Sequence, residues 1–280
     1  MLNNIDLART GVLKHAPRRY FENLRKFSAR PLLAKWAAEN GAPAQFYLNF
    51  AQVCNLLPDN GISTNPFERI EELRDRATLL RKKGDFEGAV RACEEVLELE
   101  EVSCADLLKA QDLNFLGNLF SEKGAPREAI ESYLKAAAIY ERNGDHEEMA
   151  KNFCNAALSH DATGNFTKAV KYYEKGIEAF ELVENFQEAA KVSYNAAESS
   201  KEMEDLDGAV SWYRKCFEAY EKLGDEEGKA MALAGAGFAH QEFGSLTTAL
   251  KRFKEAIKLL EGQESSLAEI IEGALASLEN

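Results

Sequence analysis

A period of 40 residues runs through most of this chain and restricts the folds open to it more than any other feature. Turn tripeptides begin 40 residues apart, at Gly84, Gly124, Gly164, Glu204 and Gly244. An alanine follows each start after five residues, and Cys93 or an aromatic residue follows four residues later. Another alanine or glycine stands twelve residues before each of those alanines. Because self-similarity at a fixed period marks stacked structural units, the sequence predicts a repeat architecture.

Within one repeat the apolar residues follow helical spacing. Positions i, i+3, i+4, i+7, i+8 and i+11 are apolar or small in the second half of the third repeat, at Ala169, Tyr172, Tyr173, Gly176, Ile177 and Phe180. Small residues at a helix crossing let two backbones approach closely, and an aromatic residue one turn later fills the space beside them. The turn glycine should end the first helix of each pair, and the Asp, Asn or Ser after it should cap the second. The predicted fold class is therefore all-α.

The Gly-Asp/Asn-Phe turn followed by A-[VI]-x-x-Y resembles the tetratricopeptide repeat (TPR) family. This resemblance covers residues 67–264 and implies a right-handed superhelical α-solenoid of five antiparallel helix pairs. The 40-residue period exceeds the usual length of about 34 residues and implies long helices, as in the SNAP-like adaptors of vesicle fusion. The SNAP resemblance rests on Phe153-Cys154-Asn155-Ala156-Ala157 with His160, and on Ala189-Ala190-Lys191 with Ala197-Glu198.

The rest of the chain completes the predicted domain organisation. Residues 1–40 form a basic N-terminal segment with a leading helix, and residues 41–66 form a degenerate helix and a loop. Residues 265–280 form a C-terminal capping helix, which Ser266 and Glu269 start as a capping box.

Charge and cysteine usage narrow the classes of partner. The net charge is −13 although residues 1–40 carry eight Lys or Arg and three acids, so the acidic body should not bind nucleic acid. Five cysteines without a C-x-x-C pair favour a reducing, cytoplasmic location. The sequence predicts neither a secretory signal nor a transmembrane segment. Because the start is rich in arginine and poor in acids, a mitochondrial presequence is the alternative.

Motifs for catalysis fail on context. Gly235-Ala236-Gly237 begins like a dinucleotide fingerprint, but His240 stands at the third glycine position and no strand precedes it. His160 and His240 occupy the same repeat position, which indicates a structural slot, and they should lie too far apart to share a metal ion. The sequence therefore predicts a protein that is not an enzyme and needs no cofactor or metal.

Candidate partner-binding residues come from the first helices, which line the concave groove in the TPR family. They are Asn114, Asn118, Lys151, Asn155, Lys191 and Asn195. Amide side chains suit an extended peptide because they both donate and accept hydrogen bonds. Some TPR proteins clamp a terminal carboxylate with five residues, of which Asn118, Asn155 and Lys191 match three. Since two of the three cations are missing, we prefer solvated or locally bonded asparagines to a clamp, and a more general peptide or helix groove is the alternative.

A basic patch in the N-terminal segment is the second candidate site. It comprises Arg18, Arg19, Arg25 and Lys26, interleaved with aromatic residues. Such a patch suits an acidic partner or peripheral contact with an anionic membrane. Alternatively, these cations neutralise the acidic repeats of the chain itself.

A second resemblance concerns residues 14–85. The basic leading helix, Gly41-Ala42-Pro43 before Phe46, and the stretch from Arg76 to Asp85 are similar to the family of the 40-kDa huntingtin-associated protein. That similarity implies a partner subunit of a large helical-repeat protein such as huntingtin, linked to endosome and vesicle traffic. The function predicted from sequence is thus a protein-binding adaptor of this kind. The alternatives are a SNAP-like adaptor in SNARE disassembly and a generic peptide-binding TPR module of the co-chaperone type.

Overall fold

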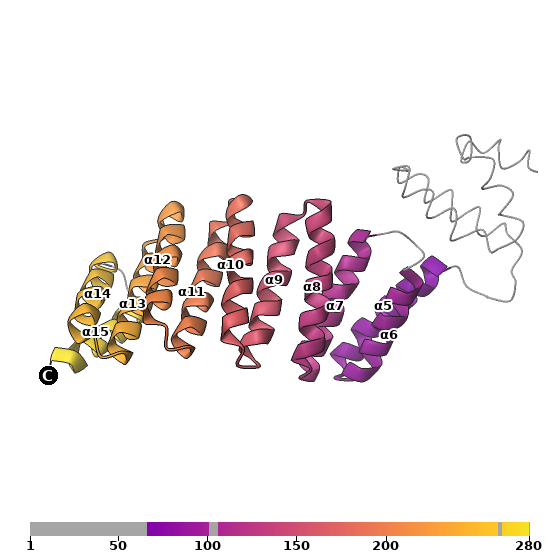
Figure 1. The fold of residues 1–280 in the computed structure, drawn as a ribbon, viewed down its shortest axis with the longest axis horizontal. Coiled ribbons are helices and arrows are strands. Elements are labelled where there is room, and N and C mark those ends of the chain that lie inside the picture. Colours follow the sequence, from indigo (N-terminus) through magenta and orange to yellow (C-terminus); the bar gives the residue numbers. More distant parts are fainter. Residues whose placement is uncertain (1–65, 101–105, 263–264, 280) are drawn as a thin grey trace, which may run out of the picture. The chain divides into compact units, whose positions relative to one another are not determined.

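The computed structural model describes residues 66–100, 106–262 and 265–279, and its repeats are pairs of antiparallel α-helices (Figure 1). The first helices of the pairs are α5 (Pro66–Lys82), α7 (Asp106–Lys123), α9 (His146–Asp161), α11 (Phe186–Glu202) and α13 (Glu226–Glu242). The second helices are α6 (Phe86–Glu100), α8 (Pro126–Asn143), α10 (Phe166–Leu182), α12 (Leu206–Leu223) and α14 (Leu246–Leu259), and α15 (Ser266–Glu279) follows them. No strand occurs in these described ranges, and the predicted all-α class is confirmed.

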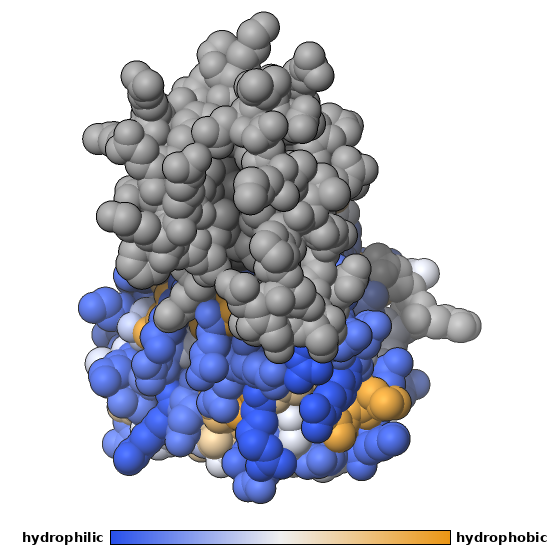
Figure 2. All heavy atoms as spheres, turned by 90° about the vertical axis from the view of Figure 1, so that its right-hand side faces the viewer, coloured by the Kyte–Doolittle hydropathy of each residue, from blue (hydrophilic) through white to orange (hydrophobic). Residues whose placement is uncertain are grey.

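Two compact units divide within α7, between Leu119 and Phe120. In the second unit, α8 to α15 stand side by side in chain order, and each helix packs on the next (Figure 1). This is an α-solenoid of TPR-like helix pairs, as the sequence predicts. Segments 1–40 and 41–66 lie outside the described residues, apart from Pro66 at the start of α5. Where described residues are visible in Figure 2, their surface is mostly hydrophilic with a small apolar patch.

The turns confirm the predicted left-handed helix ends. Gly84, Gly124, Gly164 and Gly244 have φ between 69° and 79°, a conformation that glycine adopts at little cost. Glu184 and Glu204 take the same conformation, with φ of 57° and 58°. A side chain at such a position is strained, because its Cβ approaches the backbone carbonyl.

Replacing Glu204 with glycine should therefore raise the free energy of unfolding by about 1 kcal/mol, and Glu184→Gly should do the same. Urea denaturation measures both effects. Glu181→Gly, inside α10, is the matched control and should instead lower the free energy of unfolding by about 1 kcal/mol. A loss of stability in the two turn variants would contradict this reading.

Helix capping follows the prediction only in part. Side chains of five residues accept the backbone N–H three positions later, namely Asp85, Asp145, Asn185, Asp205 and Asp225. The equivalent Asn165 and Ser245 make no such bond. At α15 the capping hydroxyl belongs to Ser265 rather than Ser266, since Ser265 Oγ accepts the N–H of Leu267 at 3.2 Å.

The small and aromatic repeat positions meet at the helix crossings. A Cβ on Gly237 would lie 2.6 Å from the ring of Phe253, and one on Gly235 would lie 2.4 Å from the ring of Tyr213. Both rings are fully buried. The absence of a side chain at each glycine is what allows the second helix to bring its ring against the first.

Candidate partner-binding site

The first helices α9 and α11 carry four of the six predicted groove residues. Lys151 and Asn155 lie on α9, and Lys191 and Asn195 lie at the equivalent positions of α11. Both helices belong to the second unit and pack against α10 from its two sides. We call these four residues the first-helix site.

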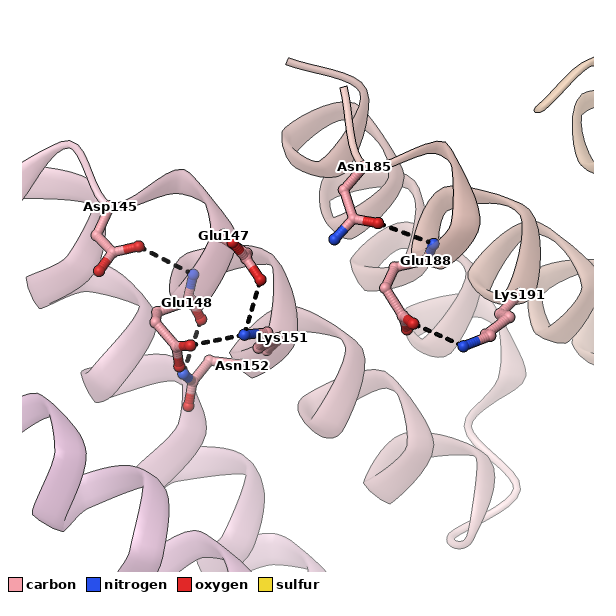
Figure 3. A network of polar contacts seen from close by, with 8 residues as sticks. All are labelled: Asp145, Glu147, Glu148, Lys151, Asn152, Asn185, Glu188 and Lys191. Carbon is pink, nitrogen blue, oxygen red and sulfur yellow. Dashed lines mark hydrogen bonds and ion pairs between the residues drawn. The ribbon is translucent and has the colours of Figure 1, made fainter. Parts of the chain in front are cut away.

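Each lysine of this site is held by the first turn of its own helix (Figure 3). Lys151 Nζ lies 2.9 Å from Glu147 Oε1 and 2.7 Å from Glu148 Oε1, and Lys191 Nζ lies 2.7 Å from Glu188 Oε1. Hydrogen bonds from the ammonium to Glu148 and then Glu147 raise the pKa of Lys151 above its ordinary value. The lysines are thus neutralised within the chain.

The glutamates are in turn positioned by the helix caps. Asp145 Oδ1 accepts the N–H of Glu148 at 3.1 Å, and Asn185 Oδ1 accepts the N–H of Glu188 at 3.3 Å (Figure 3). Carboxylates in the first turn are also favoured by the helix dipole. Because cap, glutamate and lysine recur in this order, the site offers a partner few unpaired positive charges, which disfavours a carboxylate clamp.

The asparagines of the site have a different environment. Asn155 is half-buried and Asn195 is exposed. Their backbone carbonyls accept the hydroxyls of Ser159 and Ser199, at 2.9 Å and 3.1 Å. Within the described part of the chain, neither side-chain amide has a hydrogen-bond partner. Two such amides on neighbouring first helices can bond the polar groups of a partner segment.

The other predicted site residues are not part of this arrangement. Asn114 and Asn118 lie on α7 in the first unit. Asn114 Oδ1 is buried without a hydrogen-bond partner among the described residues, and Asn118 already interacts within the chain. The predicted basic patch lies outside the described residues; its members are Arg18, Arg19, Arg25 and Lys26.

His160 has a packing role in α9. It is buried and stacks on Tyr172 at 5.5 Å between ring centroids, with 3° between the ring planes. Tyr172 also stacks on Phe153 at 6.1 Å. Burial, and then the positive Lys168, lower the pKa of His160. A neutral imidazole held in an aromatic stack agrees with the structural slot predicted for this position.

The described cysteines are buried thiols. Burial raises the pKa of Cys93, Cys154 and Cys216 to about 12 in each case. They are therefore poor nucleophiles at neutral pH, where the thiolate is scarce. Across the described ranges, no three or more His, Cys, Asp or Glu side chains are grouped to hold a metal ion. No helix in those ranges is both long and apolar enough to cross a membrane.

The first unit contains a buried ion cluster that sequence reasoning missed. Arg74 Nη2 lies 2.7 Å from Glu100 Oε1 and 2.6 Å from Asp112 Oδ2, so one guanidinium joins α5, α6 and α7. Burial, and then the negative charge of Asp112, raise the pKa of Glu100 to about 7. The three groups saturate one another, and we interpret the cluster as structural.

Two family models match the chain. The soluble NSF attachment protein (SNAP) model matches residues 113–269, which is more than half of the chain. A tetratricopeptide repeat model matches residues 70–142. No curated protein sequence matches this chain.

Solved structures of several proteins share the fold. BtubC (BKLC) from P. vanneervenii is 19% identical, with a TM-score of 0.56 over 85% of this chain and 94% of that one. MamA is 24% identical, with a TM-score of 0.52 over 69% of this chain and 93% of that one. A signal-transduction ATPase from Pyrococcus horikoshii with a tetratricopeptide repeat sensor is 14% identical, with a TM-score of 0.52 over 90% of this chain and 38% of that one. At these identities the likeness establishes the fold alone.

Proposed function

The chain belongs to the soluble NSF attachment protein family, and from this premise we propose that it is a non-enzymatic adaptor that holds another protein at the first-helix site. Helical-repeat proteins of this kind serve as protein-interaction scaffolds. The observation that carries the proposal is the pair of amides, Asn155 and Asn195, presented without partners on neighbouring first helices. Such groups favour contact with polar groups along a partner segment over the binding of a single charged end.

Family membership also suggests which partner to test. The SNAP family consists of adaptors of vesicle fusion, and the SNAP match spans nearly all of the second unit. We therefore propose a SNARE helical bundle as the partner and the cytoplasmic face of vesicles as the location. The side-by-side first helices would lie across the polar outer faces of such a bundle.

The double variant Asn155→Ala/Asn195→Ala should weaken binding of the full chain to a purified SNARE bundle about tenfold, because each lost hydrogen bond contributes about 0.5–1.5 kcal/mol. Isothermal titration calorimetry measures the affinity. Asn165→Ala is the matched control, since Asn165 sits at a turn and makes no capping bond, and its affinity should stay unchanged. Absence of binding by the unmodified chain would reject the SNARE bundle as partner, and equal binding by all variants would reject the site.

A second candidate is a partner subunit of a large helical-repeat protein such as huntingtin, in endosome or vesicle traffic. It is favoured by the extent of the SNAP match, which leaves residues 1–112 uncovered. That stretch includes the basic patch and most of the resemblance to the huntingtin-associated family. The discriminating experiment is co-purification of the full chain with purified huntingtin, using charge reversal of Arg18, Arg19, Arg25 and Lys26. Loss of co-purification on reversal supports this candidate, and no co-purification of the unmodified chain rejects it.

A further inference from the structure

A groove in the second unit lies between the second helices α12 and α14, with the first helix α13 between them. Its volume is about 760 Å³. Val210 and Phe217 line it on α12, Ala232 and Ala236 on α13, and Leu259 on α14. This second-helix groove is separate from the first-helix site, whose residues lie on α9 and α11.

The groove is open because one repeat position changes from aromatic to arginine. Tyr172, Trp212 and Arg252 stand 40 residues apart, each just before the buried aromatic residue of its second helix. Trp212 packs against a buried cluster built from α9, α10 and α11, and so does Tyr172. Arg252 instead forms an ion pair with Glu255 of its own helix at 2.9 Å. Its side chain therefore lines the groove wall where the preceding repeat has an indole.

Charge distinguishes this groove from the rest of an acidic protein. The helix α14 carries four basic residues and a single acid, whereas the whole chain has a net charge of −13. Three of the groove-lining residues are cations, namely Arg214, Arg252 and Lys258, against the two acids Asp207 and Glu255. The groove thus combines an apolar lining with an excess of positive charge at its edges.

We propose that the second-helix groove binds an amphipathic α-helix of a partner protein, with an apolar face in the groove and acidic residues along its flanks. A helix fits because the wall from Val210 to Phe217 spans seven residues, or about 10 Å, which is the rise of two turns of a bound helix. Apolar anchors at i, i+3 or i+4, and i+7 would then reach the alanines of α13. Acidic flanks complement Arg214 and Lys258 and avoid the repulsion that a basic helix would meet.

The test uses a displayed library of 16-residue amphipathic helices with fixed leucines at the anchor positions and Glu, Lys, Gln or Ser at the flanking positions. Selection is made on the full chain, with counter-selection on Arg252→Trp, which restores the aromatic residue of the preceding repeat. The expected result is enrichment of Glu over Lys at the flanks. Clones that bind the unmodified chain should lose at least about tenfold in affinity on Arg252→Trp.

Two surface variants keep the test independent of any folding defect in Arg252→Trp. Lys258 is exposed, and Lys258→Glu should weaken the selected helices about tenfold because it reverses a charge of the groove. Lys171 is an exposed lysine on α10, and Lys171→Glu is the matched control that should leave affinity unchanged. Enrichment of basic flanks, failure to enrich any helix, or equal binding by Lys258→Glu would overturn the proposal. Retained binding by a folded Arg252→Trp would overturn it as well.

Discussion

Replacing Phe253 with alanine is expected to lower the free energy of unfolding of the second unit by about 3–5 kcal/mol. The ring is fully buried in a cluster that joins α13, α14 and α15. It also contacts Phe238 edge to face, at 4.9 Å between ring centroids. Because the ring lies against Gly237, its removal leaves a cavity that the helices cannot close without moving.

The complementary change is Gly237→Leu, which should destabilise the second unit by about 1–3 kcal/mol or more through overpacking. In the double variant Gly237→Leu/Phe253→Ala, the leucine can occupy the vacated space. The combined loss should therefore fall short of the sum of the two single losses by about 1 kcal/mol or more. Urea denaturation followed by fluorescence measures all three variants. Gly273→Leu is the control, since a Cβ there meets nothing within 4 Å, and it should not destabilise.

Additive losses in the double variant would show that Gly237 and Phe253 do not share one crossing point. That result would contradict the packing on which the predicted register depends.

The second large effect is expected at the ion cluster of the first unit. Arg74→Met should lower the free energy of unfolding at pH 7 by about 3–5 kcal/mol, because it leaves two carboxylates without their shared cation. Glu100 is buried and pairs with Arg74 at 2.7 Å, and Asp112 pairs with it at 2.6 Å. Thermal and urea denaturation of the variant measure the loss.

The same cluster makes stability depend on pH. Burial and Asp112 raise the pKa of Glu100 from 4.5 to about 7 in the folded chain, so folding takes up a proton between these values. The contribution of Glu100 to stability is therefore fully present below about pH 4.5 and is lost as pH rises to about 7. One pKa unit corresponds to about 1.4 kcal/mol, so the change should be on the order of 1 kcal/mol or more.

Denaturation at pH 5, 6, 7 and 8 tests this dependence. Glu100→Gln mimics the protonated carboxyl, so its stability relative to the unmodified chain should increase as pH rises. Glu98→Gln changes an exposed residue of the same helix and should show no such trend. A constant difference between Glu100→Gln and the unmodified chain across this range would contradict the raised pKa.

Much of the fold could be predicted because each repeat states the same packing rule. Gly164 at the turn, Ala169 five residues later and Tyr173 four residues after that suffice to place one helix pair. Their recurrence at a constant 40-residue spacing places the others. These signals are local, and they act through backbone conformation and side-chain size, which a single sequence displays directly.

What the sequence did not reveal arises from contacts that occur once. Arg74, Glu100 and Asp112 lie 26 and 38 residues apart, and the first-unit cluster has no counterpart that the period would make visible. The second-helix groove results from a missing aromatic residue at Arg252, which a search for conserved spacing passes over. The pairing of Lys151 with Glu147 and Glu148, by contrast, was readable from helical spacing, and it explains why the predicted groove lysines are neutralised.

The central claim is that this chain works by holding other proteins on its helical surfaces. The most direct measurement is quantitative affinity purification from cells, comparing the unmodified chain with the combined variant Asn155→Ala/Asn195→Ala/Arg252→Trp. We predict that the unmodified chain recovers at least one protein in near-stoichiometric amount, and that the folded variant recovers much less of it. Recovery of no protein above background by the unmodified chain, or equal recovery by both chains, would contradict the account.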